Sequence, residues 1–126
     1  LFIVNDDINL CEKVGADGIH IGQSDINARL VRAALGKKFI IGVTCHDSLK
    51  LAIDAENNSA DYIALGAIFH SINKPKAIHC PLSKINNIKK NINIPIVGIG
   101  GINFENQSLA YDAGCDAVAM IDGLFG

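Results

Sequence analysis

Short apolar runs recur along the chain, and each run ends in glycine and polar residues. Continuous apolar runs of this length are typical of parallel strands that are buried on both faces. Amphipathic segments with helical spacing separate the runs, so strands and helices alternate. This alternation predicts a parallel sheet that is connected by right-handed crossovers. We predict strands at Phe2–Val4, Gly18–Ile21, Phe39–Val43, Tyr62–Leu65, Ile96–Ile99 and Ala117–Ile121.

The amphipathic segments predict a helix after each of the first five strands. Asp25 precedes the second helix and Asp47-Ser48 precedes the third, and these residue types favour the N-cap position. A small residue followed by aspartate recurs where a helix leads into the next strand, at Asp17, Asp61 and Asp116. The recurrence indicates repeated units with short loops. The expected helices are Ile8–Val14, Ile26–Leu35, Leu49–Glu56, Ser83–Lys90 and Glu105–Ala113.

The fold class is therefore α/β, and the number of βα units favours a (β/α)8 TIM barrel. A closed barrel needs eight units and about 200 residues or more. We expect residues 1–126 to form one partial TIM-barrel domain that covers about the last six units, with the first two βα units absent. A doubly wound open sheet is the alternative, but no GxGxxG fingerprint follows the first strand.

Composition narrows the classes of function. Hydrophobic residues make up 49% of the chain and the net charge is −2, which suits a buried core. Lysine and arginine form no run, so we expect no nucleic-acid partner. No apolar stretch approaches the roughly 20 residues of a membrane span. We expect a cytoplasmic enzyme with reduced cysteines that acts on small molecules, and a homo-oligomer is the macromolecular assembly that the sequence leaves open.

Carboxylates end the first two predicted strands, at Asp6 and Asp25. Adjacent strand ends of a barrel lie close enough for two aspartates to share one cation. Mg²⁺ prefers such oxygen ligands and keeps sites open for water and phosphate oxygens. Asn5 and Gln23 beside them strengthen the hypothesis. The alternative is that the two aspartates only cap the helices that follow.

Two later strand ends are suited to phosphate. Gly100-Gly101 and Ile121-Asp122-Gly123 follow the last two strands, and barrels of this class often bind phosphate there through backbone N–H groups. The long loop after Leu65 carries hydroxyl, amide and ammonium groups that could hold anionic oxygens. His20 alternates within a strand, which indicates a hydrogen-bonded histidine of the barrel interior. His46 follows a strand and could serve in acid–base chemistry.

Six segments in this order resemble the thiamine phosphate synthase family, and the resemblance spans nearly the whole chain. The family is a (β/α)8 barrel. It joins 4-amino-2-methyl-5-hydroxymethylpyrimidine diphosphate to a thiazole phosphate, which gives thiamine phosphate and diphosphate. The matching segments are Val4–Asp6, Ala16–Asp25, Ile41–His46, Ala60–Ile63, Gly66–Lys74 and Pro95–Ile102.

The resemblance implies a role for each candidate residue. Asp6 and Asp25 would bind Mg²⁺ as the cofactor, and Asn5 and Lys74 would be catalytic. The pyrimidine diphosphate would contact Asn5, Thr44 and Lys74. The thiazole phosphate site would comprise Ser71, Ile72, Asn73, Gly101, Ile121 and Asp122.

Some positions depart from the family pattern. Asp122 stands where a small polar residue is common, and a carboxylate facing phosphate would repel it. We expect the first two strands of the family's barrel, which carry a glutamine–leucine–arginine motif, to be missing from residues 1–126, and we therefore expect residues 1–126 alone to be inactive. A thiazole tautomerase on the same barrel, with His46 as its acid–base group, is one alternative. A non-catalytic phosphate-binding remnant is another.

Overall fold

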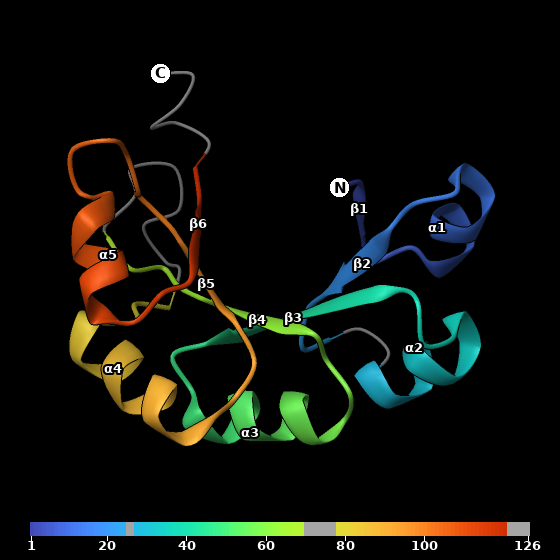
Figure 1. Cartoon of the computed structure of the whole chain (residues 1–126), viewed down its shortest axis with the longest axis horizontal. Helices are drawn as coiled ribbons and strands as arrows, with labels where there is room; N and C mark the ends of the chain where they lie inside the picture. The colour runs from blue at the N-terminus through green and yellow to red at the C-terminus, as the bar shows by residue number, and fades with distance from the viewer. Residues whose placement is uncertain (25–26, 70–77, 121–126) are drawn as a thin grey trace.

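The computed structural model describes residues 1–24, 27–69 and 78–120. Its strands form one six-stranded sheet in the order β1-β2-β3-β4-β5-β6, and each neighbouring pair is parallel. The sheet curls, and β1 and β6 lie at its two ends, on the open side of the curve (Figure 1). The strands are β1 (Ile3–Asn5), β2 (Gly18–Ile21), β3 (Ile40–His46), β4 (Tyr62–Leu65), β5 (Ile96–Ile99) and β6 (Ala117–Ala119).

The helices of the described part cover the convex face of this sheet (Figure 1). The first two lie at one end of the curve, α3 lies in the middle, and the last two lie at the other end. This order follows from a crossover helix between each pair of adjacent parallel strands. The helices are α1 (Ile8–Val14), α2 (Ala28–Leu35), α3 (Leu49–Asn57), α4 (Leu82–Asn91) and α5 (Gln107–Ala113).

The hydrophobic core lies between the convex face and the helices. Ile19, Ile41 and Ile63 are fully buried in successive strands. They share one apolar cluster with Val31 of α2 and Ile85 of α4. Side chains alternate across a strand, so residues next to these isoleucines lie on the concave face. The sheet therefore separates two groups of side chains. The apolar core lies on its convex face, and the polar residues of β2, β3 and β4 lie on its concave face.

The recurring aspartates each bind the preceding strand at two points. The Asp61 N–H donates to the Ile41 carbonyl at 2.7 Å, and its carboxylate accepts from the Ile41 N–H at 2.8 Å. Asp116 makes the same pair of bonds with Ile96, at 2.8 and 2.9 Å. Asp17 makes them with Phe2, at 2.8 and 2.7 Å. The repeated junction therefore fixes the register of strand pairs at the end opposite the candidate site.

Several element ends differ from the sequence predictions. β3 continues past Val43 to His46, because Thr44 pairs with Ala64 of β4 before the register shifts. The N-cap of α2 is Asn27, whose side chain accepts from the Leu30 N–H at 3.1 Å, so the expectation of Asp25 as the cap is wrong. Other ends move by one or two residues. Ser48 caps α3 as expected.

Candidate functional site

The ends of β1 and β2 bring the first candidate residues together. Asn5 pairs in register with His20, and both side chains therefore lie on the concave face. The Asp6 N–H donates to the His20 carbonyl at 2.9 Å, which holds Asp6 at the strand end with a left-handed φ of 64°. Asn5 and Asp6 are both exposed. Their amide and carboxylate are thus accessible where the two strands end.

Neither predicted metal ligand is the residue that caps the following helix. Asp7 caps α1, with its carboxylate accepting from the Leu10 N–H at 2.9 Å, and Asn27 caps α2. The alternative in which Asp6 and Asp25 serve only as caps is therefore wrong for Asp6. For α2 the capping position is already taken by a different residue. The N-cap of α1 is Asp7 and not Asp6.

Three polar side chains form a connected cluster on the concave face. His20 of β2 lies between Thr44 of β3 and Tyr62 of β4. Its Nε2 is 2.7 Å from the Thr44 hydroxyl, and its Nδ1 is 2.8 Å from the Tyr62 hydroxyl. The His20 and Tyr62 rings are also in contact, with their centroids 5.6 Å apart. This confirms His20 as a hydrogen-bonded interior histidine.

The surroundings of this cluster keep its members uncharged. Burial lowers the pKa of His20 below its ordinary value and raises the pKa of Tyr62 above its own. Both effects oppose the charged form, so a neutral imidazole faces a neutral phenol near pH 7. Thr44 is held a second time, because the Gln23 side-chain amide donates to its carbonyl at 2.6 Å. Thr44 is partly exposed near the carboxyl end of β3.

Glycines shape the ends of β4 and β5. Gly100 and Gly101 have left-handed φ values of 100° and 65°, which glycine adopts at little cost. A Cβ at Gly100 would lie 2.6 Å from the Ala67 Cα, so the two loops require glycine here. The Ile68 N–H donates to the Ile99 carbonyl at 3.0 Å, which joins the loop after β4 to the end of β5. Gly101 thus lies at a strand end without a side chain.

The cysteines are buried and free. Burial raises the pKa of Cys45 to about 12 and the pKa values of Cys80 and Cys115 to about 11. A thiol must ionise to act as a nucleophile or to ligate a metal. These three cysteines therefore behave as small core residues. Cys45, although it follows the apolar run of β3, does not face the strand-end site.

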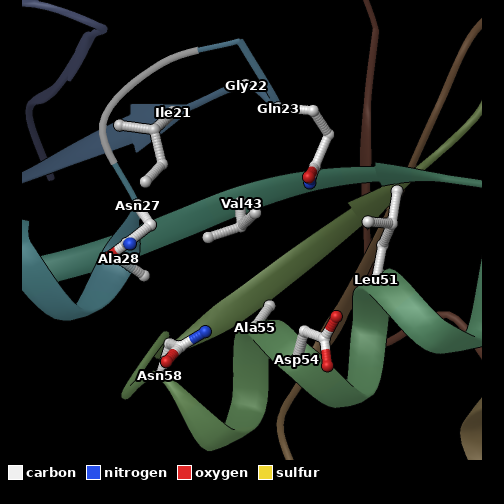
Figure 2. Close-up of a pocket in the computed structure, with 10 residues that line it drawn as sticks. All are labelled: Ile21, Gly22, Gln23, Asn27, Ala28, Val43, Leu51, Asp54, Ala55 and Asn58. Carbon is white, nitrogen blue, oxygen red and sulfur yellow. The ribbon is translucent and has the colours of Figure 1, made fainter.

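A cavity of about 190 Å³ lies on the other side of the sheet (Figure 2). It is bounded by Ile21 and Val43 of the strands and by Asp54 and Asn58 at α3. Its volume is below the roughly 300–1,000 Å³ of typical small-molecule sites. The Asp54 carboxylate also disfavours an anionic ligand. The concave strand ends therefore remain the better candidate for a functional site.

Several predicted site residues lie outside the described residues. Among the residues that the structure describes, histidine, cysteine, aspartate and glutamate form no group of three or more that could hold a metal. In the same part of the chain, no helix has the length and apolar character needed to cross a membrane. The predicted residues outside the description are Asp25, Ser71, Ile72, Asn73, Lys74, Ile121 and Asp122.

The sequence reasoning missed two contributors to the site. It assigned no role to Tyr62, which reads as an apolar strand residue, and it treated Gln23 only as a neighbour of Asp25. Gly42 is the signal that could have indicated Tyr62. A glycine in a buried strand often marks the close approach of another group, and here that group is the Tyr62 ring.

The sequence of this chain is similar to known proteins over nearly its whole length. A family model described as thiamine monophosphate synthase matches residues 1–124. The chain belongs to this family. A thiamine-phosphate synthase of Thioalkalivibrio sulfidiphilus is 45% identical over 99% of this chain and 59% of its own length. One from Nitrosococcus oceani is 47% identical over 98% of this chain and 57% of its own length.

The fold of this member of the thiamine monophosphate synthase family is similar to that of a solved structure. A thiamine phosphate pyrophosphorylase from Pyrococcus furiosus superimposes with a TM-score of 0.86 at 32% identity. The match covers 96% of this chain and 57% of that one. The chain therefore spans just under three fifths of the length of the relatives that it matches. The curled six-stranded parallel sheet is shared with this relative.

Proposed function

We propose that the protein carrying this chain is a thiamine phosphate synthase. It would join the pyrimidine diphosphate to the thiazole phosphate and release diphosphate. The observation that carries the proposal is the family match over residues 1–124. It is supported by relatives named thiamine-phosphate synthase that are 45 and 47% identical over nearly the whole chain. The polar strand ends on the concave face supply groups suited to two anionic substrates.

We propose that the six strands form part of a closed (β/α)8 barrel, completed by two further βα units. The sequential strand order and the curl of the sheet support this arrangement. β1 and β6 would otherwise present unpaired edges, which promote association. Residues 1–126 expressed alone should therefore aggregate or pack loosely, as measured by light scattering and urea unfolding. A monomer with one cooperative transition would contradict the barrel proposal.

We propose that Asp6 and Asp25 hold Mg²⁺. Asp6 suits this role because the residue is exposed just after β1, and Asp7 rather than Asp6 caps α1. A carboxylate is also the type of oxygen ligand that this hard cation prefers. A bound Mg²⁺ would neutralise negative charge on the diphosphate. Asp6 would in addition fix the position of the strand end through its backbone bond to His20.

The remaining residues divide between the two substrates. Asn5, Thr44 and Lys74 would contact the pyrimidine diphosphate, with Asn5 and Lys74 in catalytic roles. Asn5 and Thr44 support this assignment because both lie at carboxyl ends of strands on the concave face. Gly101 would allow close approach of backbone N–H groups to the thiazole phosphate. Ser71, Ile72, Asn73, Ile121 and Asp122 would complete that second site.

The reaction then requires positioning and charge stabilisation rather than a protein nucleophile. The carbon–oxygen bond to diphosphate breaks, and the pyrimidine amino group stabilises the cationic methylene that remains. The thiazole nitrogen forms the new carbon–nitrogen bond. Lys74 would stabilise the leaving charge, which grows toward the transition state. Walls at the strand ends would hold the two substrates in line for attack.

The product assay tests this function. Intact protein is supplied with both substrates and Mg²⁺, and thiamine phosphate is followed by chromatography. We expect product only when both substrates are present. A thiazole tautomerase would instead isomerise the thiazole phosphate without the pyrimidine diphosphate, and that result would overturn the proposal. The expected cytoplasmic location and small-molecule partners are part of the same proposal.

A further inference from the structure

The polar cluster on the concave face joins side chains of three neighbouring strands. His20 is level with Gly42 of β3, and Gly42 is level with Tyr62 of β4. A Cβ at Gly42 would overlap the Tyr62 ring, so the tyrosine lies across the glycine to reach His20. Thr44 lies one side-chain step closer to the carboxyl end on the same face. The cluster therefore runs from Tyr62 through His20 toward the strand-end site.

The hydrogen-bonding capacity of these groups allows two proton orders. A neutral imidazole has one donor and one acceptor nitrogen, and a hydroxyl donates one proton while accepting others. In one order Tyr62 donates to Nδ1, Nε2–H donates to the Thr44 oxygen, and the Thr44 proton points elsewhere. In the reverse order the Thr44 hydroxyl donates to Nε2, and Nδ1–H donates to the Tyr62 oxygen. Only the first order leaves a hydroxyl donor for an anionic oxygen.

We propose that His20 and Tyr62 are positioning residues that fix the Thr44 hydroxyl as a hydrogen-bond donor to the diphosphate of the substrate. The inference rests on the proposed function, which places the pyrimidine diphosphate beside Thr44. His20 makes no contact with substrate in this arrangement and acts through Thr44. The Gln23 amide, which donates to the Thr44 carbonyl, holds the backbone of the same residue. Side chain and backbone of Thr44 are thus both held by residues in or just after β2.

Two amide substitutions separate the two bonds of His20. In His20→Gln the terminal amide reaches the position of Nε2, so it can still donate to Thr44. In His20→Asn the amide reaches only the position of Nδ1, so the bond to Tyr62 survives and the bond to Thr44 is lost. We expect His20→Asn in the intact protein to lower kcat on the order of tenfold, because Thr44 then loses the orientation in which it donates a charge-assisted hydrogen bond to the diphosphate. His20→Gln should stay within about threefold of wild type, and the KM for thiazole phosphate should not change in either variant.

A double-mutant cycle tests whether His20 acts through Thr44. Thr44→Val keeps the side-chain shape and removes the hydroxyl, whereas Thr44→Ser keeps the hydroxyl and serves as the matched control. In the Thr44→Val background, His20→Asn should lower kcat by less than about twofold further. Independent losses that multiply would overturn the inference. Equal rates for His20→Gln and His20→Asn would overturn it as well.

A measurement on the wild-type protein tests the inference even if the variants fail to fold. Nitrogen-15 NMR of the His20 ring distinguishes a protonated Nε2 from a protonated Nδ1. With inorganic diphosphate and Mg²⁺ bound, we expect the proton on Nε2, and Tyr62→Phe should shift it partly to Nδ1. A proton on Nδ1 in the wild type would overturn the proposed order. Absence of product from wild type would instead refute the proposed function, whatever the NMR result.

Discussion

Adding one methyl group at Gly42 should displace Tyr62 and destabilise the sheet. Gly42 is buried in β3, and an added Cβ would overlap the ring and hydroxyl of Tyr62. Its φ lies outside the left-handed region, so the backbone itself accepts alanine. Any cost of Gly42→Ala is therefore steric. The variant tests directly whether Tyr62 occupies the space over the glycine.

The magnitude follows from three contributions. Overpacking costs about 1–3 kcal/mol. Displacing the ring also breaks the Tyr62–His20 hydrogen bond, which contributes about 0.5–1.5 kcal/mol. Replacing glycine by alanine returns about 0.4–1 kcal/mol through the unfolded chain. The expected net loss is about 2 kcal/mol, which lowers the urea midpoint by about 1 M for an m value of about 2 kcal/mol/M.

Urea unfolding of the intact protein with and without the Tyr62 ring isolates this effect. In a Tyr62→Ala background the methyl group has space, so Gly42→Ala should become neutral or slightly stabilising. Gly15→Ala is the matched control, because Gly15 has a left-handed φ of 66° and open space around its Cα. Its cost should be unchanged by Tyr62→Ala. A Gly42→Ala cost that persists without the ring would refute the reasoning.

Further predictions concern the metal, the two anions and an ion pair. Asp6→Asn and Asp25→Asn should each sharply reduce turnover, with partial rescue by added Mg²⁺, and near-normal steady-state rates in both would contradict the shared ion. Lys74→Ala should mainly lower kcat, whereas Gly101→Val should mainly raise the KM for thiazole phosphate. If neither variant changes these constants, Lys74 does not act on the diphosphate and Gly101 does not lie at the thiazole phosphate. The Lys89 ammonium and then the Ile96 N–H hold the pKa of Asp116 below its usual range. Its stabilisation should be present above the ordinary carboxyl pKa and be lost as pH falls through the folded value. Asp116→Asn should therefore cost under about 1 kcal/mol at neutral pH, because the pair is exposed, and the difference should vanish in acid-titrated urea unfolding.

The strands were predictable where apolar runs have clear ends. β2, β4 and β5 match their predicted bounds because glycine or polar residues flank each run. β3 was predicted too short, since its last residues are Thr44, Cys45 and His46, whose polar character resembles a loop. Only pairing with β4 shows that they continue the strand. The local apolar pattern predicts that a strand is present, whereas pairing with the neighbouring strand determines where that strand ends.

Helix starts depend on competition between similar capping residues. Asp25 and Asn27 are both good N-caps two positions apart, and the apolar spacing does not distinguish them. α5 begins later than predicted because Asn103 first forms a turn. Its side chain accepts from the Glu105 and Asn106 N–H groups at 2.9 and 2.8 Å. Side-chain bonds of this kind compete with the first helical turn.

The candidate site was predictable one strand end at a time. Asn5 and Asp6 were singled out because polar residues follow the first apolar run, whereas Thr44 was named through the family resemblance. The structure has Asn5 at the end of β1 and Thr44 near the end of β3, and their roles stay predictions. The contacts of His20 with Thr44 and Tyr62 join residues 24 and 42 positions apart. Such contacts depend on strand register and on the space over a glycine. They became visible only when β2, β3 and β4 were placed side by side.

The most direct test of the central claim is the stoichiometry of the reaction in the intact protein. Thiamine phosphate and released diphosphate are measured together over one time course, with both substrates and Mg²⁺ present. We predict equal amounts of the two products and no diphosphate release without thiazole phosphate beyond slow hydrolysis. Altered thiazole phosphate with no diphosphate released, or no product at all, would contradict the assignment of these strand ends to thiamine phosphate synthesis.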